Sequence, residues 1–206
     1  MKFDYVIGID EVGRGALAGP LVVVAATFSP EARLLIRRLK LKDSKKLSPK
    51  RRIEIFEAVG KNPWIRWSAA RVSPSVIDRL NVSQAANLAA SRALIRLLSR
   101  QETFFEKPKI ILDGGLRLRD NLLFKNGLAN LSSETLIKAD DKIKSVMLAS
   151  IIAKVIRDRR MINYHKHYPS YGFDVNKGYG TRIHISALKQ NGFSEIHRQS
   201  FLRKYF

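Results

Sequence analysis

The sequence contains no cysteine, which excludes a disulfide framework and a thiolate metal site. It also lacks an apolar run long enough to cross a bilayer, so no membrane-spanning segment is expected. The first residues, MKFDYVIGID, reach an acidic side chain too early for a secretory signal peptide. These absences predict a cytoplasmic protein with no membrane partner.

Acidic residues are in the minority, with 18 Asp+Glu against 38 Lys+Arg and a formal net charge of +20. The basic residues are spread along the chain, so we expect a broadly cationic surface and a polyanionic partner, above all nucleic acid. A membrane surface is a weaker alternative because no long amphipathic helix carries the basic residues. A basic protein without a particular ligand is the other alternative.

The length of 206 residues and the 45% hydrophobic composition fit one soluble domain with a real core. Short apolar or β-branched runs predict strands over residues 5–9, 21–28, 64–72, 109–112 and 135–138. Helical spacing predicts helices over 49–60, after Asn81, over 142–161, and briefly over 184–192. The alternation indicates a mixed α/β fold.

Acidic residues follow three of the predicted strands. Asp10 and Glu11 follow the first, Asp113 follows the run KIIL, and Asp140 with Asp141 follows TLIK. In an open α/β sheet, neighbouring strand ends converge on one crevice, so we expect these acids to meet there. Gathered carboxylates cannot all be ionised unless a cation lies among them.

Oxygen ligands without His or Cys select Mg²⁺ or Mn²⁺. On a cationic surface, such a site is typical of two-metal phosphodiester hydrolysis. One ion then generates the attacking hydroxide and the other stabilises the leaving oxygen. The sequence therefore predicts a metal-dependent nuclease.

Taken singly, most of these acids have ordinary structural explanations. Asp113 precedes two glycines, as in many turns, and Asp140 or Asp141 could cap the following helix. The pair Asp10 and Glu11 has no such explanation, because it precedes GRG and caps no predicted helix. This pair is what favours the metal interpretation.

The segment GRGALAG also satisfies the dinucleotide-binding pattern through Gly13, Gly15 and Ala18. That interpretation needs a helix next, but Pro20 and a β-branched run follow instead. A better use of the two glycines is close backbone approach to a nucleic-acid strand, with Arg14 reaching phosphate or sugar.

Seven motifs, IDEVGRGALAGP, DSKKLS, LDGG, KADDKIKSVMLASIIAKVIRD, YPSYGF, NKGYGT and HRQSF, resemble in order and spacing those of bacterial-type ribonuclease HII. The resemblance implies a ribonuclease H-like fold, with a central mixed five-stranded sheet flanked by helices. It also implies one catalytic domain over residues 1–206, in which roughly 165–206 form a small C-terminal helical region carrying the substrate-recognition tyrosine. We expect a monomer.

The same resemblance implies endonucleolytic cleavage of RNA in RNA–DNA hybrids, and nicking of DNA duplexes 5′ of single ribonucleotides. The products would carry 3′-OH and 5′-phosphate ends. It assigns the metal ligands and catalytic residues to Asp10, Glu11, Asp113 and Asp140, with Mg²⁺ or Mn²⁺ in a two-metal site. The alternative is a non-catalytic basic nucleic-acid-binding protein whose acids are only caps and turns.

Substrate recognition also follows from the resemblance. Recognition of the ribose 2′-OH is assigned to Gly13, Arg14, Gly15 and Tyr179, which is chemically sensible because this group distinguishes RNA from DNA. Phosphate contact is expected of Lys45 and Lys46 in DSKKLS. An exposed lysine pair in a solvated loop is the ordinary alternative.

Three positions depart from the usual family pattern. Ala139 replaces a glycine, Asn176 replaces a frequent histidine, and Asp141 adds an acid that could compete with Asp140 as a ligand. The spacing to ASIIAKV favours Asp140.

The C-terminus resembles a sliding-clamp-binding peptide. The residues concerned are Gln199, Leu202, Tyr205 and Phe206. Because they overlap HRQSF, we favour a terminal helix that packs Phe201 inward.

Overall fold

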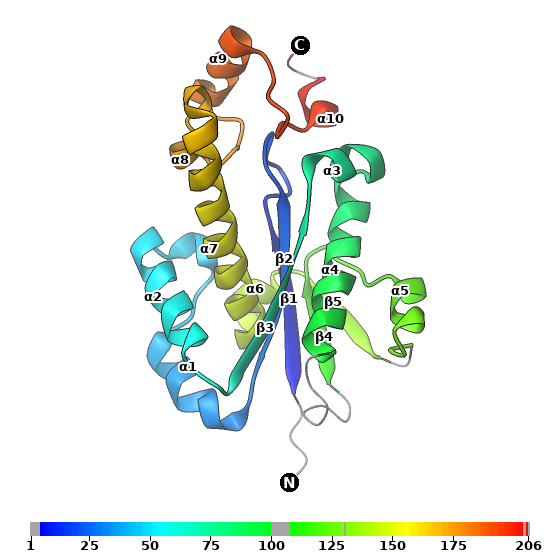
Figure 1. Ribbon diagram of the computed structural model, residues 1–206. Coiled ribbons are helices and arrows are strands. Elements are labelled where there is room, and N and C mark those ends of the chain that lie inside the picture. The colour runs from blue at the N-terminus through cyan, green and yellow to red at the C-terminus, as the bar shows by residue number, and fades with distance from the viewer. Residues whose placement is uncertain (1–4, 100–107, 130, 204, 206) are drawn as a thin grey trace.

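The computed structural model describes residues 5–99, 108–129, 131–203 and 205, and is built on one mixed sheet (Figure 1). The strands are β1 (Val6–Val12), β2 (Leu21–Phe28), β3 (Ile65–Val72), β4 (Lys109–Asp113) and β5 (Ser133–Leu136). Their order is β3-β2-β1-β4-β5, with β1 antiparallel to β2 and parallel to β4. This arrangement confirms the mixed five-stranded sheet that was expected.

Helices cover both faces of this sheet (Figure 1). One face carries α1 (Arg33–Leu39), α2 (Pro49–Gly60), α6 (Ala139–Lys142) and α7 (Lys144–His167). The other carries α3 (Pro74–Leu80), α4 (Val82–Leu98) and α5 (Asp120–Lys125). Beyond one end of the sheet lie α8 (Phe173–Asn176), α9 (Arg182–Asn191) and α10 (Gln199–Leu202). Three 3₁₀ turns, η1 (Pro30–Ala32), η2 (Ser44–Lys46) and η3 (Pro169–Tyr171), complete the described elements.

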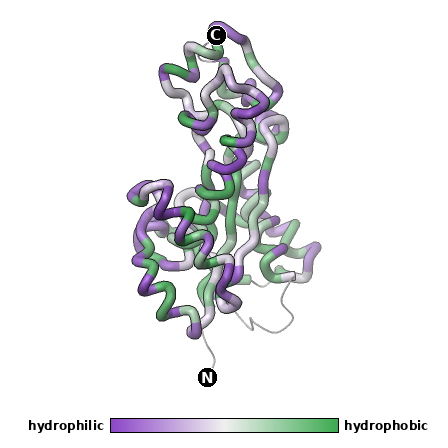
Figure 2. The backbone as a smooth tube through the Cα atoms, turned by 60° about the vertical axis from the view of Figure 1, so that its left-hand side comes forward, coloured by the Kyte–Doolittle hydropathy of each residue, from purple (hydrophilic) through white to green (hydrophobic). Residues whose placement is uncertain are grey.

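Strand alternation divides the core between the two faces. Along β2, Val23 packs with Leu94 of α4 on one face, whereas Val22 and Val24 pack with Leu148 of α7 on the other. In Figure 2, hydrophobic residues lie mainly along the centre of the molecule, and hydrophilic residues lie mainly on the outer helices. At Gly8, strand β1 and helix α7 come so close that an added Cβ would lie 2.2 Å from the backbone nitrogen of Val146.

Local sequence signals located most long elements. The Ser48 side chain caps α2, which begins at Pro49 and ends at Gly60 as expected, and Asn81 caps α4 through the Gln84 N–H. The last residue expected in α4, Arg100, lies outside the described residues.

Several predicted boundaries were wrong. The long helix expected over 142–161 is α7, which runs from Lys144 to His167, and the short helix expected over 184–192 is α9, which runs from Arg182 to Asn191. Two further differences concern the acids. β1 continues to Val12, so Asp10 and Glu11 lie inside the strand rather than after it. β5 ends at Leu136, and Asp140 lies in the separate short helix α6. Both differences move an acid relative to its strand without removing it from the end of the sheet.

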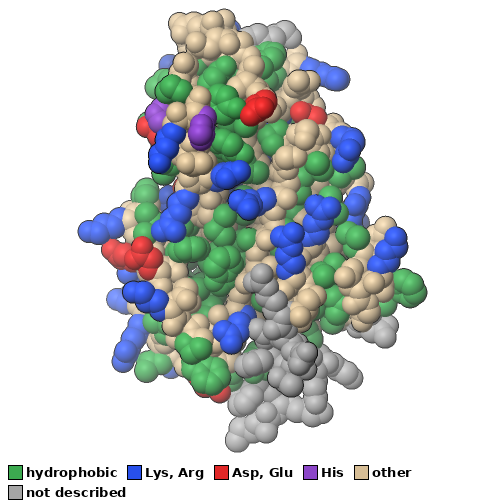
Figure 3. All heavy atoms as spheres, in the orientation of Figure 1, with side chains coloured by type: hydrophobic (Ala, Val, Ile, Leu, Met, Phe, Trp, Pro, Cys, Tyr) green, Lys and Arg blue, Asp and Glu red, His purple; other side chains and the backbone are tan. Residues whose placement is uncertain are grey.

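The surface is cationic over wide areas, and Lys and Arg outnumber acidic side chains on the face shown in Figure 3. Within the described part of the chain, no helix is both long and apolar enough to cross a membrane.

Candidate active site

A cleft of about 450 Å³ lies where β1, β4, α6 and α7 meet. Its walls bring together most of the residues that the sequence singled out. They are Asp10, Glu11, Val12, Gly13, Arg14, Gly15, Ser44, Lys45, Asp113, Asp140, Ser150, Lys154 and Tyr179.

Three carboxylates converge in this cleft. Asp10, Asp113 and Asp140 each offer an oxygen, and these oxygens lie within 4.8 Å of one another. Asp10 and Asp113 come from the neighbouring parallel strands β1 and β4, so sheet geometry alone brings them close. The convergence expected from strand ends is therefore observed for these two acids.

Asp140 reaches the cluster by a different route. Asp113 Oδ1 accepts hydrogen bonds from the backbone N–H groups of Ala139 (2.6 Å) and Asp140 (3.3 Å). Asp113 therefore satisfies the N-terminus of α6, the capping role that the ordinary interpretation gave to Asp140 or Asp141. The left-handed turn is made by Lys138 (φ 57°), so Ala139 occupies the usual glycine position without a positive φ.

Burial and repulsion between neighbouring carboxylates raise the pKa values of the clustered acids. Burial raises the pKa of Asp10 well above its usual range, and the Glu11 and Asp113 carboxylates raise it further. The pKa of Asp140 is also raised by burial and by Asp113. Ser150 donates a hydrogen bond to Asp10, and its hydroxyl lies 2.9 Å from that of Ser44.

Glu11 lines the same cleft but faces a different partner. Its Oε1 lies 3.3 Å from Arg14 Nη1, whereas its buried Oε2 has no hydrogen-bond partner among the residues that the structure describes. Burial raises the pKa of Glu11, and the neighbouring Arg14 partly offsets this effect. Glu11 is not one of the three acids within 4.8 Å, so the structure groups three of the four predicted ligands.

The donor set fits hard divalent cations. It consists of carboxylates, three of them clustered, with raised pKa values and one orphaned oxygen on Glu11. A cation among these groups would relieve both the repulsion and the missing partner. Oxygen-only ligation favours Mg²⁺ or Mn²⁺.

The two glycines of GRG differ in their surroundings. Gly13 has φ +92°, and an added Cβ would lie 2.2 Å from Arg157 Nε, so only glycine fits. Gly15 has no neighbouring heavy atom within 4 Å of an added Cβ and therefore opens onto the cleft. After Ala18 the chain enters β2 at Leu21 with no intervening helix, so the dinucleotide-binding interpretation fails.

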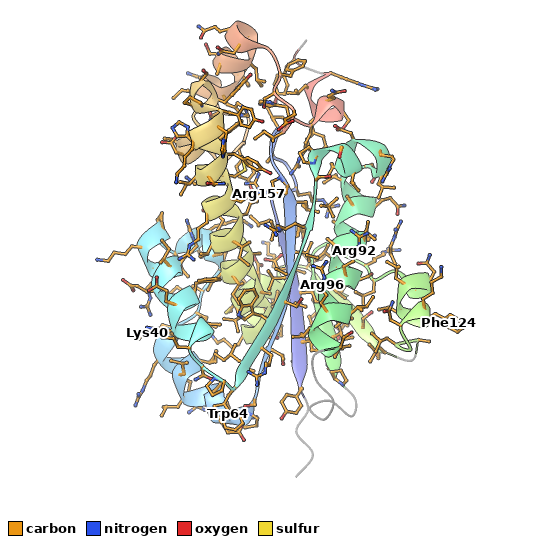
Figure 4. The ribbon with its side chains drawn as sticks, viewed as in Figure 1. Lys40, Trp64, Arg92, Arg96, Phe124 and Arg157 are labelled. Carbon is orange, nitrogen blue, oxygen red and sulfur yellow. The ribbon has the colours of Figure 1, made fainter. Side chains whose placement is uncertain are left out.

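Tyr179 is half-buried at the edge of the cleft, and the Arg157 guanidinium lies 5.2 Å from its ring centroid. Figure 4 shows Arg157 between α7 and the sheet. It donates to the carbonyls of Ala18, Pro20 and Lys177. Asn176, at the frequent histidine position, accepts from Gly178 N–H and so shapes the turn before Tyr179.

The lysine pair divides into two roles. Lys45 lines the cleft, whereas Lys46 lies outside it and forms an ion pair with Asp141 at 2.6 Å. Asp141 is exposed and separate from the carboxylate cluster, so it does not compete with Asp140 for the position between Asp10 and Asp113.

Sequence reasoning missed several residues of the cleft. The sequence did not single out Ser150 or Lys154 as site residues, yet both line the cleft. Their i, i+4 spacing on α7 was the available signal. Ser44 and Arg157 had no comparable signal, because their partners come from distant parts of the chain.

At the C-terminus, Leu202 is buried at 2% exposure, and Phe201 packs against the core and over the Arg198 guanidinium. The inward packing of Phe201 is as expected. Phe206 lies outside the described residues.

Residues 7–204 match the family model described as Ribonuclease HII. Relatives named ribonuclease HII include one from Treponema denticola, 42% identical over 96% of this chain and 98% of the relative. Another, from Alkaliphilus metalliredigens, is 41% identical over 98% of this chain and 92% of the relative.

Solved structures agree with these matches. The PCNA:RNase HII complex from Archaeoglobus fulgidus superposes with a TM-score of 0.74 at 29% identity, covering 94% of this chain and 93% of that chain. Bst-RNase HIII in complex with Mn²⁺ superposes with a TM-score of 0.71 at 25% identity, covering 91% of this chain and 61% of that chain. The ribonuclease H-like fold is thereby confirmed.

Proposed function

The chain belongs to the ribonuclease HII family, and from this premise we propose that it nicks DNA duplexes 5′ of single embedded ribonucleotides by two-metal-ion catalysis. Membership itself establishes a metal-dependent ribonuclease H endonuclease, so the non-catalytic alternative is wrong. The clustering of Asp10, Asp113 and Asp140 in a cleft beside Gly15 and Tyr179 is the observation that carries the proposal. We further propose that residues 1–206 act as one catalytic domain and as a monomer.

Asp10, Glu11, Asp113 and Asp140 would hold two Mg²⁺ or Mn²⁺ ions. When bound, the ions would supply activation of water and stabilisation of the leaving oxygen, giving 3′-OH and 5′-phosphate ends. The protein orients this ligand set through its own hydrogen bonds: Ser150 donates to Asp10, and Asp113 is fixed by the N–H groups of α6. Ordered ligands reduce the reorganisation required during reaction.

Cationic side chains around the carboxylates would attract and align the substrate. Lys45 and Lys154 line the cleft and would contact backbone phosphate. Arg14 is held by Glu11 and by Ser83 of α4, with Nη2 2.8 Å from the serine hydroxyl. This leaves Arg14 at the mouth of the cleft, where it would contact phosphate or sugar beside the scissile bond.

Recognition of RNA would depend on groups at one edge of the cleft. The open position of Gly15 allows a sugar to approach the backbone, and the Tyr179 ring would stack on that sugar. Hydrogen bonds to the 2′-OH from these groups would distinguish ribose from deoxyribose.

The direct test is incubation with a duplex that contains one embedded ribonucleotide, with Mg²⁺ or Mn²⁺. We expect a single nick on the 5′ side of that ribonucleotide. Asp10→Asn and Asp140→Asn should still bind the duplex but cleave it roughly a thousandfold more slowly. The reason is that each variant would lose several kcal/mol of transition-state stabilisation by the metals. Failure of the wild-type protein to nick with either metal would sink the proposal.

We also propose a sliding-clamp contact through Gln199, Leu202, Tyr205 and Phe206. An archaeal relative was solved as a PCNA complex, which supports the idea. Because Leu202 is buried in this chain, binding would require α10 to leave its position. Deleting residues 205–206 should abolish co-purification with a clamp, and no clamp binding by the intact protein would end the proposal.

A further inference from the structure

Two histidines are buried side by side near the proposed recognition tyrosine. His184 of α9 is 0% exposed and His197 is 3% exposed, and their Nε2 atoms lie 3.1 Å apart. The rings of Tyr171 and Phe173 enclose the pair, with the Tyr171 ring centroid 4.8 Å from that of His197. Such a buried pair is stable only if its polar atoms are satisfied.

Backbone partners determine where the protons lie. His184 Nδ1 is 2.9 Å from the Tyr179 carbonyl, which can only accept, so His184 carries its proton on Nδ1. His197 Nδ1 lies 2.8 Å from the Ser194 hydroxyl and accepts from the Ser194 N–H at 3.0 Å. Because that N–H can only donate, His197 carries its proton on Nε2. His197 Nε2–H therefore donates to His184 Nε2, and every ring nitrogen is satisfied.

This arrangement requires both rings to be neutral. A second proton on His184 would set two N–H groups against each other, and one on His197 would face the Ser194 N–H. Burial lowers the pKa of both rings, and the neighbouring His184 helps to lower the pKa of His197 to about 4. A single chain of hydrogen bonds thus runs from the Ser194 N–H through the His197 and His184 rings to the Tyr179 carbonyl.

The pair lies between the two halves of the proposed ribose recognition site. On one side, the Tyr179 carbonyl accepts from His184 and from the Thr181 N–H at 2.8 Å. On the other side, the backbone of His197 forms an isolated β-bridge with Ala18, in the segment that follows GRG.

Arg198 reinforces the second connection. Its backbone N–H donates to the Leu17 carbonyl at 2.8 Å, and its buried side chain donates to the carbonyls of Arg14 and Gly19. The segment 194–198 therefore contacts residues 17–19 through its backbone and the GRG step through the Arg198 side chain. It reaches the tyrosine loop through His197 and then His184.

We propose that His184 and His197 are positioning residues, and that this pair of fixed tautomers sets the Tyr179 loop relative to the Gly13–Gly15 step. The inference rests on the proposed role of these residues in recognising ribose. It assigns specificity for single ribonucleotides partly to two side chains that never touch the substrate.

The test compares variants that keep or remove the relevant N–H group. His184→Phe keeps a ring but removes the donor to Tyr179, whereas His184→Asn places an amide N–H near the position of Nδ1. His197→Phe and His197→Gln form the equivalent comparison at the other ring. His167→Phe, at an exposed position of α7, is the matched control.

The diagnostic quantity is the ratio of kcat/KM on a single-ribonucleotide duplex to kcat/KM on a long RNA–DNA hybrid. We expect His184→Phe to lower this ratio about tenfold and His184→Asn to restore it to within about threefold of wild type. A merely structural role would lower both activities together and leave the ratio unchanged. An unchanged ratio in His184→Phe, or in His197→Phe if the former does not fold, would overturn the inference.

Nitrogen NMR of the wild-type protein tests the pair without any activity measurement. We expect His184 as the Nδ1–H tautomer and His197 as the Nε2–H tautomer at neutral pH. Reversed tautomers, or a protonated ring, would also overturn the inference. A wild-type protein that cleaves long hybrids but not single ribonucleotides would overturn the proposed function and the recognition role, while leaving the tautomer assignment standing.

Discussion

Lys46 Nζ lies 2.6 Å from Asp141 Oδ1, so an ion pair ties the loop containing Lys45 to the short helix containing Asp140. The lysine expected to contact phosphate is thus paired with an acid of the protein itself. Asp141→Asn should free Lys46 and tighten binding of an RNA–DNA hybrid about threefold at low salt, with the gain fading as salt rises. Its effect on stability should stay below about 1 kcal/mol, because the pair is exposed.

Fluorescence anisotropy over a salt series measures this effect. Lys45→Ala is the companion variant, and it should weaken binding and reduce the salt slope by about one. Weaker binding by Asp141→Asn would contradict the prediction.

The two glycines of GRG should respond differently to alanine. Gly13→Ala places Cβ against Arg157 at a positive φ, so we expect a loss of about 1–3 kcal/mol of stability. Gly15→Ala has open space and an ordinary φ, so its stability should change by less than about 0.5 kcal/mol. Its nicking rate should nevertheless fall, roughly a hundredfold, if a sugar must approach there.

Thermal unfolding and nicking assays on both variants separate the two cases. A fully active Gly15→Ala variant would show that the substrate does not come close to this backbone.

Tyr179→Phe keeps the ring against Arg157 and removes only the hydroxyl. We expect a loss of about tenfold on single-ribonucleotide duplexes, the size of one hydrogen bond. Stability should be nearly unchanged. Nicking rates measured on gels test this prediction. A variant as fast as the wild type would show that the Tyr179 hydroxyl takes no part in recognition.

His197 makes stability depend on pH. Its pKa is lowered from 6.5 to about 4 by burial, so the unfolded chain binds the proton more tightly than the folded one. The contribution of neutral His197 to the free energy of unfolding is fully present above about pH 6.5. About 3 kcal/mol of this free energy should be lost as the pH falls toward about 4.

Denaturant unfolding of wild type and His197→Gln across this window checks the prediction, because the variant should show a flatter curve. Parallel curves for the two proteins would contradict it. His167→Gln, at an exposed site, should behave as wild type.

Asp10→Asn should stabilise the metal-free protein, because it removes one of several buried carboxylates with raised pKa values. A gain of about 1 kcal/mol would raise Tm by roughly 2–4 °C. Added Mg²⁺ or Mn²⁺ should raise Tm in the wild type and much less in the variant. Equal metal-induced shifts in both proteins would argue against ligation by Asp10.

Features governed by local chemistry were predictable from the sequence. Ser48, Pro49 and Gly60 marked both ends of α2, since capping and breaking depend on neighbouring residues. Parallel-strand geometry also predicted that Asp10 and Asp113 would meet. Their roles as metal ligands stay predictions.

Features that depend on distant backbone were not predictable. Arg157 was not singled out, because its acceptors are carbonyls of residues far away in sequence. The ring of His197, which precedes α10, pairs with His184 of α9, and no local pattern indicates this contact. The role of Asp113 at the start of α6 was missed because that helix is only four residues long.

Helix α7 has 24 residues and is therefore about 36 Å long. Its first half lies in the core beneath β1 and β2, where Leu148 and Ile151 are fully buried, and Met161 in its second half lies in the C-terminal cluster. Unfolding of either region must break hydrogen bonds of the same helix, so the two should exchange their amide protons as one cooperative unit. Continuity of this helix would thus keep the separation between the three clustered acids and the tyrosine loop constant during thermal motion.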